Sequence, residues 1–220
     1  MRSQPLLQPE FGSLALRLLF IRHAHTSGNG GVGSHAVLQG RTDLPLSARG
    51  QEEVRLLRLR LRCESRFDAI YSSPLRRAVE TAAPLNNLGE LHLCSNLQEI
   101  DCGMLDGIPL EQVKREHPDL WASNLRQKDE QFRWPGGESY HEFRSRCLSA
   151  VAGLAARHDG YVAVVTHAGV ISQVLGALAG KSSAEWEPFR PGHTALTELL
   201  WTVHGVKVLR YDDRAHLMAA

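Results

Sequence analysis

Short apolar runs recur along the chain between longer amphipathic stretches. These runs cover residues 16–21, 68–72, 92–97 and 161–165. Continuous apolar runs of this length, bounded by polar or turn-forming residues, predict strands that are buried on both faces. Near the end of the chain, residues 194–201 and 206–211 flank His204 and Gly205. This arrangement predicts a β-hairpin.

The amphipathic stretches begin with helix start signals. Ser47 can cap a helix in which Val54 and Leu57 fall on one apolar face. Ser73 followed by Pro74 predicts a second helix, with the proline at its first position. This start would put Arg76 and Arg77 in the first turn of that helix.

Three further helices are predicted in the second half of the chain. A short one begins at Pro109 and is expected to end at Pro118, because proline cannot continue a helix. Ser139 and Glu142 have the spacing of a capping box, and residues 168–179 continue the fourth strand as a helix. Strands that alternate with helices predict an α/β fold, with three α/β/α layers around a mostly parallel mixed sheet that has an antiparallel edge.

Length and charge narrow the class of protein. A chain of 220 residues suffices for one well-buried domain, so we expect a flexible tail over residues 1–13 and a single domain over residues 14–220. Lys and Arg number 25 and Asp and Glu number 24. This balance favours neither nucleic acid nor a membrane surface as a partner, and no run approaches the roughly 20 apolar residues of a membrane span.

An arginine stripe and the four cysteines could indicate RNA binding or a metal site, but a structural role explains both better. Arg55, Arg58 and Arg62 share one helix face, which we interpret as solvated because no aromatic side chains are interleaved for RNA binding. The cysteines are Cys63, Cys94, Cys102 and Cys147. They lie far apart, without the close pairs of a zinc site or a small disulfide framework, so we predict a cytoplasmic protein and interpret Cys102 as a packed thiol.

Polar side chains that suit a phosphate gather at the ends of the predicted strands. Arg22 and His23 follow the first strand, and His167 follows the fourth. The carboxyl ends of parallel strands form the edge where open α/β sheets bind ligands. Arg77 in a first helical turn and the glycine-rich loop 27–34 add a cation and free backbone N–H groups. Any single histidine is more often structural, but this combination indicates a phosphate site.

Five blocks of residues carry a family resemblance. They are Arg22, His23, Ala24 and Asn29; Gln39, Gly40, Asp43, Pro45, Leu46 and Gly50; Ser72, Ser73, Leu75, Arg77, Ala78, Thr81 and Ala82; Glu99 and Gly103; and Thr166, His167, Ala168 and Gly169. Their order and spacing resemble the motifs of the histidine phosphatase superfamily, the phosphoglycerate mutase-like enzymes. The likeness runs from about Leu16 to about Leu200 and implies the phosphoglycerate mutase-like fold.

The resemblance implies a metal-independent phosphatase that needs no cofactor. His23 would attack the phosphorus of a small phosphorylated metabolite, and water would hydrolyse the phosphohistidine to release inorganic phosphate. Glu99 would serve as the general acid and base. The remaining implied roles are charge stabilisation by Arg22, Arg77 and His167, and substrate binding by Asn29, Ala168 and His25. Arginines would supply the charge that magnesium supplies elsewhere. The resemblance leaves open whether the protein forms a homodimer.

Departures from the family pattern keep alternatives open. Ala24 replaces the usual glycine of the family. Because alanine has a Cβ atom, the backbone at this position must have a negative φ. His25 stands where mutases carry glutamate, so a phosphoglycerate mutase is the second choice of function after a phosphatase. For His25 itself, a position on the surface and a role in substrate binding are equally supported. Residues 132–140 are similar to fructose-2,6-bisphosphatases, but Ala168 and Ser172 replace the glutamine and arginine of those enzymes. A non-catalytic phosphate binder ranks last because it would not need Glu99.

Overall fold

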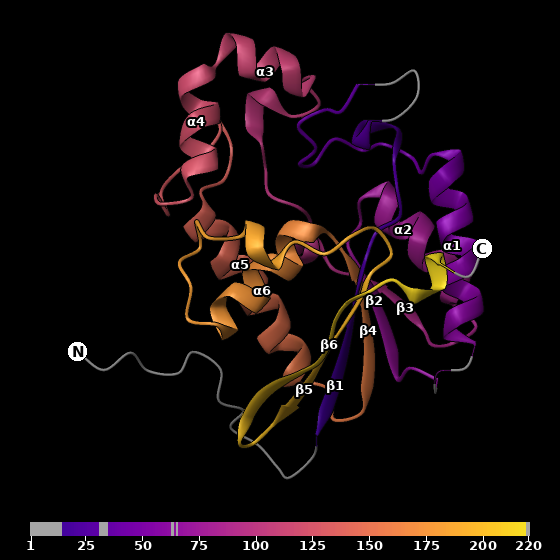
Figure 1. Cartoon of the computed structure of the whole chain (residues 1–220). Coiled ribbons are helices and arrows are strands. Elements are labelled where there is room, and N and C mark those ends of the chain that lie inside the picture. The colour runs from indigo at the N-terminus through magenta and orange to yellow at the C-terminus, as the bar shows by residue number, and fades with distance from the viewer. Residues whose placement is uncertain (1–14, 31–34, 63, 65, 219–220) are drawn as a thin grey trace.

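A six-stranded mixed sheet forms the centre of the molecule (Figure 1). The computed structural model describes residues 15–30, 35–62, 64 and 66–218; the expected tail over residues 1–13 lies outside them. The strands are β1 (Leu16–Arg22), β2 (Ala69–Ser72), β3 (Leu91–Leu93), β4 (Tyr161–Thr166), β5 (Leu196–Thr202) and β6 (Gly205–Asp213). In the sheet order β3-β2-β4-β1-β5-β6, the first four strands are parallel, and β5 and β6 form an antiparallel hairpin at one edge. The predicted mostly parallel sheet with an antiparallel edge is therefore confirmed.

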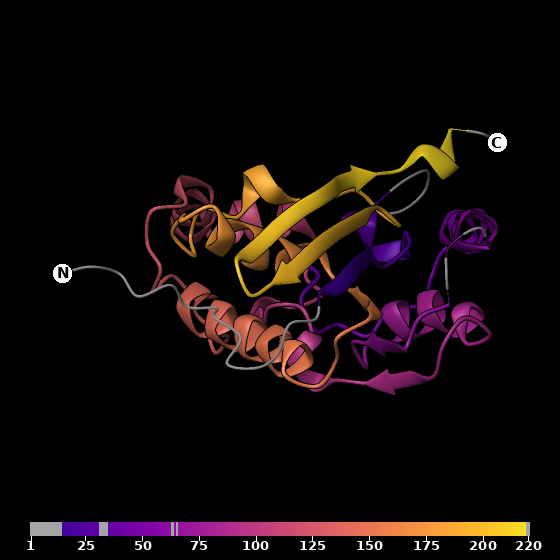
Figure 2. The ribbon, with the colours of Figure 1, turned by 90° about the horizontal axis from the view of Figure 1, so that it is seen from below.

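Helices cover both faces of the sheet (Figures 1 and 2). The helices α1 (Ala48–Leu61) and α2 (Arg76–Ala82) pack on one face, where Leu57 and Ala78 lie in the same core as Ile21. The helices α5 (Tyr140–Ala155) and α6 (Ala168–Leu178) pack on the other, where Phe143 joins Phe20. Alternate residues of β1 thus enter opposite cores, as the period of a strand dictates. The predicted three layers are confirmed.

The predicted caps of two helices are present. The Ser47 hydroxyl accepts a hydrogen bond from the Gly50 backbone N–H at 3.1 Å, and Ser139 and Glu142 form the expected capping box at the start of α5. Each cap provides a partner for a backbone N–H that the helix itself cannot bond. Arg55 and Arg58 are exposed, as their interpretation as a solvated face of α1 requires.

The prediction for the start of α2 was wrong by two residues. The helix begins at Arg76, with Leu75 as its N-cap, and Pro74 lies outside it. The Ser73 backbone N–H donates to the Val165 carbonyl at 3.0 Å, which holds the chain in the extended form beyond β2. Arg76 and Arg77 still occupy the first turn, as predicted.

The third strand and the region beyond it also differ from expectation. The strand β3 is only three residues long, because the chain turns into a 3₁₀ helix at Ser95. Pro118 ends α3 (Leu110–Glu116) as predicted, but it is also the first residue of α4 (Pro118–Arg126), a helix that the sequence analysis missed. The 3₁₀ helices are η1 (Ser27–Asn29), η2 (Ala83–Leu85), η3 (Ser95–Leu97), η4 (Gly103–Leu105), η5 (Glu187–Phe189) and η6 (Ala215–Leu217).

The helices α3 and α4 stand together as a separate lobe, above the end of the sheet where β1 ends (Figure 1). They extend the wall of the site described below. Within the described part of the chain, every helix falls short of the length and apolarity that a membrane span requires.

Candidate active site

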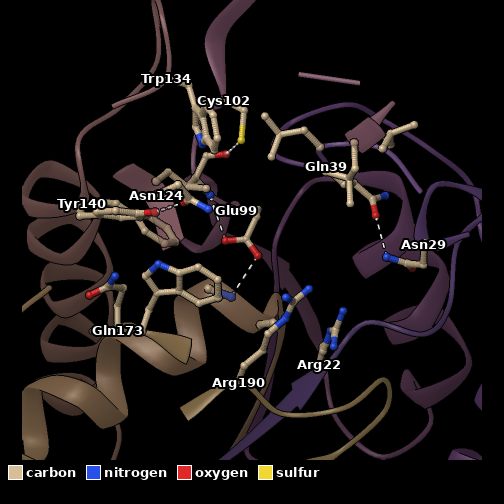
Figure 3. Close-up of a pocket in the computed structure, with 18 of the residues that line it drawn as sticks. Arg22, Asn29, Gln39, Glu99, Cys102, Asn124, Trp134, Tyr140, Gln173 and Arg190 are labelled. Atoms are coloured by element: carbon tan, nitrogen blue, oxygen red, sulfur yellow. Dashed lines mark hydrogen bonds between the residues drawn. The ribbon is translucent and has the colours of Figure 1, made fainter. Parts of the chain in front are cut away.

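A cavity of about 210 Å³ lies at the carboxyl end of β1 (Figure 3). It is smaller than the roughly 300–1,000 Å³ typical of pockets for drug-sized ligands, which suits a small substrate. Arg22 and His23 at the end of β1 line this cavity, as do Ala168 and Gly169 at the start of α6. Glu99, two residues after the end of η3, also lines it. The parallel strands therefore bring these residues together at the predicted edge of the sheet.

The imidazole of His23 is held as a neutral base. Its Nδ1 lies 2.8 Å from the Ala24 carbonyl oxygen, which can only accept, so Nδ1 carries the hydrogen and Nε2 keeps its lone pair. Burial, together with the charges of Arg77 and Arg22, lowers the pKa of His23 well below its usual value. Ala24 is not among the described residues with positive φ, so its methyl group is accommodated as required. The hydrogen bond to the Ala24 carbonyl therefore fixes the tautomer in which Nε2 can act as a nucleophile.

The guanidinium of Arg22 is fixed by two neighbours on the loop before β5. Nη1 donates to the Pro191 carbonyl at 2.8 Å, and Nη2 lies 3.0 Å from Nε2 of His193. Burial lowers the pKa of Arg22 to about 9, so the group remains cationic at neutral pH. Its Nε is buried and has no hydrogen-bond partner among the described residues. A buried cation with a free donor is a site that favours an anion.

Arg77 and His167 lie next to His23 but do not line the cavity. Nε of Arg77 donates to Nδ1 of His167 at 3.2 Å, and Nε2 of His167 lies 2.8 Å from the Ser73 hydroxyl. The rings of His167 and His23 have centroids 5.2 Å apart. Both ring nitrogens of His167 are therefore occupied within the protein. Contact of Arg77 and His167 with the phosphate oxygens remains a prediction.

The position of Arg77 is fixed from the opposite side by a short loop. Nη2 and Nη1 donate to the carbonyl oxygens of Gly40 and Thr42 at 2.6 and 2.8 Å. The Asp106 carboxylate in turn accepts hydrogen bonds from the backbone N–H groups of Gly40, Arg41 and Thr42. One carboxylate thus organises the loop that holds the buried arginine, a role that no sequence motif indicated.

Glu99 accepts one backbone N–H on each carboxylate oxygen. Oε1 is 3.0 Å from the Ile100 nitrogen, and Oε2 is 3.0 Å from the Gly169 nitrogen in the first turn of α6. A Cβ atom at position 169 would lie 2.1 Å from Oε1. Gly169 therefore allows the carboxylate to approach the helix N-terminus, which fixes its position in the cavity wall.

The three residues assigned to substrate binding have different environments. Ala168 and Asn29 line the cavity. The Asn29 amide donates to Gln39 Oε1 at 3.1 Å (Figure 3). The Asn29 side-chain oxygen accepts a hydrogen bond from the Thr26 backbone N–H. His25 does not line the cavity, and the surface position considered for it is wrong: the residue is buried, and its Nδ1 lies 2.9 Å from the Ser47 hydroxyl oxygen. Residues 31–34 of the glycine-rich loop lie outside the described part of the chain.

The loop 190–194 also belongs to the site, although no sequence motif indicated it. Arg190 lines the cavity beside Arg22 (Figure 3), and its guanidinium lies 5.9 Å from the centroid of the Trp186 ring. A signal was present in the predicted hairpin: β5 is antiparallel to β1, so it begins at the edge where the parallel strands end. The chain just before an antiparallel edge strand therefore belongs to the candidate site.

Two other features of the cavity bear on its chemistry. Cys102 lines it, but burial raises the pKa of its thiol well above the usual value, which supports its interpretation as a packed side chain. Within residues 15–30, 35–62, 64 and 66–218, no three His, Cys, Asp or Glu side chains converge in a way that could hold a metal ion.

Comparison with known proteins identifies the family. Residues 18–214 match branch 1 of the histidine phosphatase superfamily. The chain is 30% identical to phosphoserine phosphatase 1 of Hydrogenobacter thermophilus, covering 92% of this chain and 94% of the relative. It is 28% identical to phosphoglycerate mutase-like protein 4 of Arabidopsis thaliana, covering 89% and 80%.

A solved structure agrees with this result. YhfR of Bacillus stearothermophilus superposes with a TM-score of 0.82 at 25% identity, covering 92% of this chain and 99% of that one. The family match begins in β1 and ends after β6, so it takes in the whole sheet and its helices. It includes His23 at the end of β1. The chain therefore belongs to branch 1 of the histidine phosphatase superfamily and is a phosphoric monoester hydrolase of that family.

Proposed function

We propose that the protein hydrolyses a small phosphomonoester without a metal ion, through a phosphohistidine on His23. The observation that carries this proposal is the arrangement of two neighbours in the cavity. His23 is a neutral imidazole with Nδ1 bonded to a carbonyl oxygen, and Arg22 is a buried cation with a free Nε–H. A nucleophile with an available lone pair thus stands next to a donor that favours the phosphate dianion.

The proposed reaction has two steps. In the first, Nε2 of His23 attacks phosphorus, the ester P–O bond breaks, and the leaving oxygen takes a proton from Glu99. In the second, Glu99 takes a proton from water, the oxygen of that water bonds to phosphorus, and the P–N bond breaks. These steps release inorganic phosphate and restore His23 and Glu99 to their starting states. Glu99 is suited to both proton transfers because two backbone N–H groups fix its position.

Fixed cations supply the charge stabilisation in this proposal. Arg22 and Arg190 face the cavity, and Arg77 lies just beyond His23. The transferring phosphoryl group spreads negative charge over three oxygens, and guanidinium groups match their geometry. Since these cations belong to the protein, the proposed mechanism needs neither a metal ion nor another cofactor.

A variant of the nucleophile tests the proposal. His23→Ala should lower kcat for p-nitrophenyl phosphate by several powers of ten, because covalent catalysis is lost. Its thermal melting should stay near that of the native protein. The native enzyme should retain its activity in EDTA and be inhibited competitively by vanadate. More than about one per cent residual activity in the variant, or a requirement for added magnesium after chelation, would contradict the proposal.

The physiological substrate is proposed only as a class, a small phosphorylated metabolite. The relatives include a phosphoserine phosphatase and a phosphoglycerate mutase-like protein, so phosphoserine and phosphoglycerate belong in any substrate panel. A mutase would return the phosphoryl group to an acceptor instead of to water. The cytoplasmic location and the absence of nucleic-acid and membrane partners remain predictions.

A further inference from the structure

The wall of the cavity has a charged part and an apolar part. Among the described residues that line it, the charged side chains are Arg22, Glu99 and Arg190. Figure 3 shows the two arginines side by side, with Glu99 between them and the pair formed by Asn124 and Tyr140. Many of the other lining residues belong to one apolar cluster beneath α3 and α4: Leu38, Ile100, Trp121, Trp134, Tyr140 and Trp186.

Among the described lining residues, the cation nearest the apolar part is Arg190, 5.9 Å from the centroid of the Trp186 ring, and it lies beside Arg22 at the charged end of the cavity (Figure 3). Lys114 lies near the apolar part, with Nζ 5.3 Å from the centroid of the Trp121 ring. However, Lys114 does not line the cavity, and it is paired with Glu111 at 2.6 Å. A carboxylate or second phosphate placed beside Trp121 and Tyr140 would lose its hydration without gaining a cation as its partner.

Among the described residues of the apolar part, two donors are free to recognise a ligand: the buried Nε1 of Trp186 and the amide of Asn124. The Tyr140 hydroxyl donates to Oδ1 of Asn124, which fixes the amide. Nδ2 of Asn124 has no partner among the described residues, although the side chain is largely buried and lines the cavity. This amide can donate a hydrogen bond to a hydroxyl or carbonyl oxygen of the substrate.

We propose that the part of the cavity formed by Trp121, Asn124 and Tyr140 receives a neutral leaving group that carries an apolar ring. The preferred substrates are then phosphomonoesters of uncharged, ring-bearing alcohols, and phosphoserine and phosphoglycerate are poor ones. This inference rests on the proposed phosphatase function and adds the class of its leaving group. The ring would stack on the aromatic side chains while the phosphate lies between His23 and Arg22.

Matched alkyl esters separate recognition from chemistry. We would measure kcat/KM for 2-phenylethyl phosphate, ethyl phosphate, O-phospho-L-serine and 3-phosphoglycerate. The first two release alkoxides of similar basicity, so their difference reports binding of the ring. The proposal expects 2-phenylethyl phosphate to exceed each of the other three by about tenfold or more.

Variants of α4 test where that preference arises. Trp121→Ala should remove most of the advantage of 2-phenylethyl phosphate and leave ethyl phosphate and inhibition by inorganic phosphate within about twofold. Trp121→Phe should restore much of the advantage. Leu125→Ala is the control, because Leu125 is exposed on the same helix and does not line this cavity. Thermal melting of each variant checks that it folds.

The outcomes separate this inference from the function on which it rests. If p-nitrophenyl phosphate and ethyl phosphate are hydrolysed but the ring gives no advantage, the leaving-group assignment alone is overturned. The same holds if phosphoserine or 3-phosphoglycerate is preferred, or if Trp121→Ala reduces hydrolysis of both alkyl esters equally. If the native enzyme hydrolyses none of these esters, the proposed function and this inference both fall.

Discussion

Nη2 of Arg22 lies 3.0 Å from Nε2 of His193, although the two residues are far apart in the sequence. Because a guanidinium can only donate, His193 must accept with an unprotonated Nε2. Burial and the charge of Arg22 lower the pKa of His193 to about 2, so the acceptor stays neutral. The next residue, Thr194, has φ near +51°, a strained conformation for a β-branched residue. The backbone thus departs from ordinary geometry just where it presents His193 to Arg22.

We predict that His193 positions Arg22 for phosphate binding. His193→Ala should lower kcat/KM for p-nitrophenyl phosphate by about tenfold to a hundredfold, as expected when a hydrogen bond to a charged group is lost. It should also weaken inhibition by inorganic phosphate. His193→Gln should retain more activity, because its amide oxygen can accept from Arg22. His204→Gln changes an exposed histidine and serves as the control. If the alanine variant and the native protein have equal kcat/KM, His193 does not position Arg22 for phosphate binding.

Acid should destabilise the fold through buried neutral imidazoles. Folding lowers the pKa values of His23, His167 and His193 from 6.5, so the unfolded chain binds more protons than the native protein below about pH 6.5. The free energy of unfolding should therefore fall as the pH drops from 7 to 5, by up to about 1.4 kcal/mol per pH unit for each such group.

Urea unfolding at several pH values measures this slope. His193→Gln should lower the number of protons taken up on unfolding by about one, and so reduce the slope of the free energy of unfolding against pH. His204→Gln should leave this slope unchanged. A free energy of unfolding that stays flat between pH 7 and 5 in the native protein would show that these imidazoles are not held neutral.

Asp106 is predicted to control activity through Arg77. Its carboxylate accepts the backbone N–H groups of Gly40 and Thr42, whose carbonyl oxygens hold the guanidinium. Asp106→Ala should leave these N–H groups without a partner, cost about 1–3 kcal/mol of stability and lower kcat by about tenfold or more. Glu111→Ala, at an exposed carboxylate on α3, is the matched control. Urea unfolding and kcat are measured on both variants; full activity in Asp106→Ala would mean that Arg77 needs no such support.

Gly169→Ala should impair catalysis without weakening the fold. The new methyl group would displace the Glu99 carboxylate, whereas alanine favours helix over glycine by up to about 1 kcal/mol. We expect the variant to lose far more activity on alkyl phosphates than on p-nitrophenyl phosphate, because only the alkoxide needs a proton from Glu99. Glu99→Gln should show the same pattern. Equal losses on both substrates would indicate that Glu99 has a structural role instead.

The sequence predicted the sheet and much of the site because these depend on local signals. Apolar runs marked β1 and β4, and the residues that follow them, His23 and His167, lie next to each other as expected. The helix α4 was missed because Pro118 both ends one helix and begins the next, and sequence rules treat these as alternatives. Arg190 and His193 belong to no local motif, and only the antiparallel return of β5 brings them to Arg22.

The phosphorylated enzyme itself provides the most direct test of the central claim, that His23 carries the phosphoryl group. Enzyme mixed with ³²P-labelled p-nitrophenyl phosphate and quenched in alkali within milliseconds should hold label that is alkali-stable and acid-labile, on the peptide containing His23. The label should decay to inorganic phosphate in water and be absent from His23→Ala. Label that persists and moves to added phosphoglycerate would indicate a mutase instead. If the native enzyme turns over and never carries label, or if the variant carries it equally, the account is contradicted.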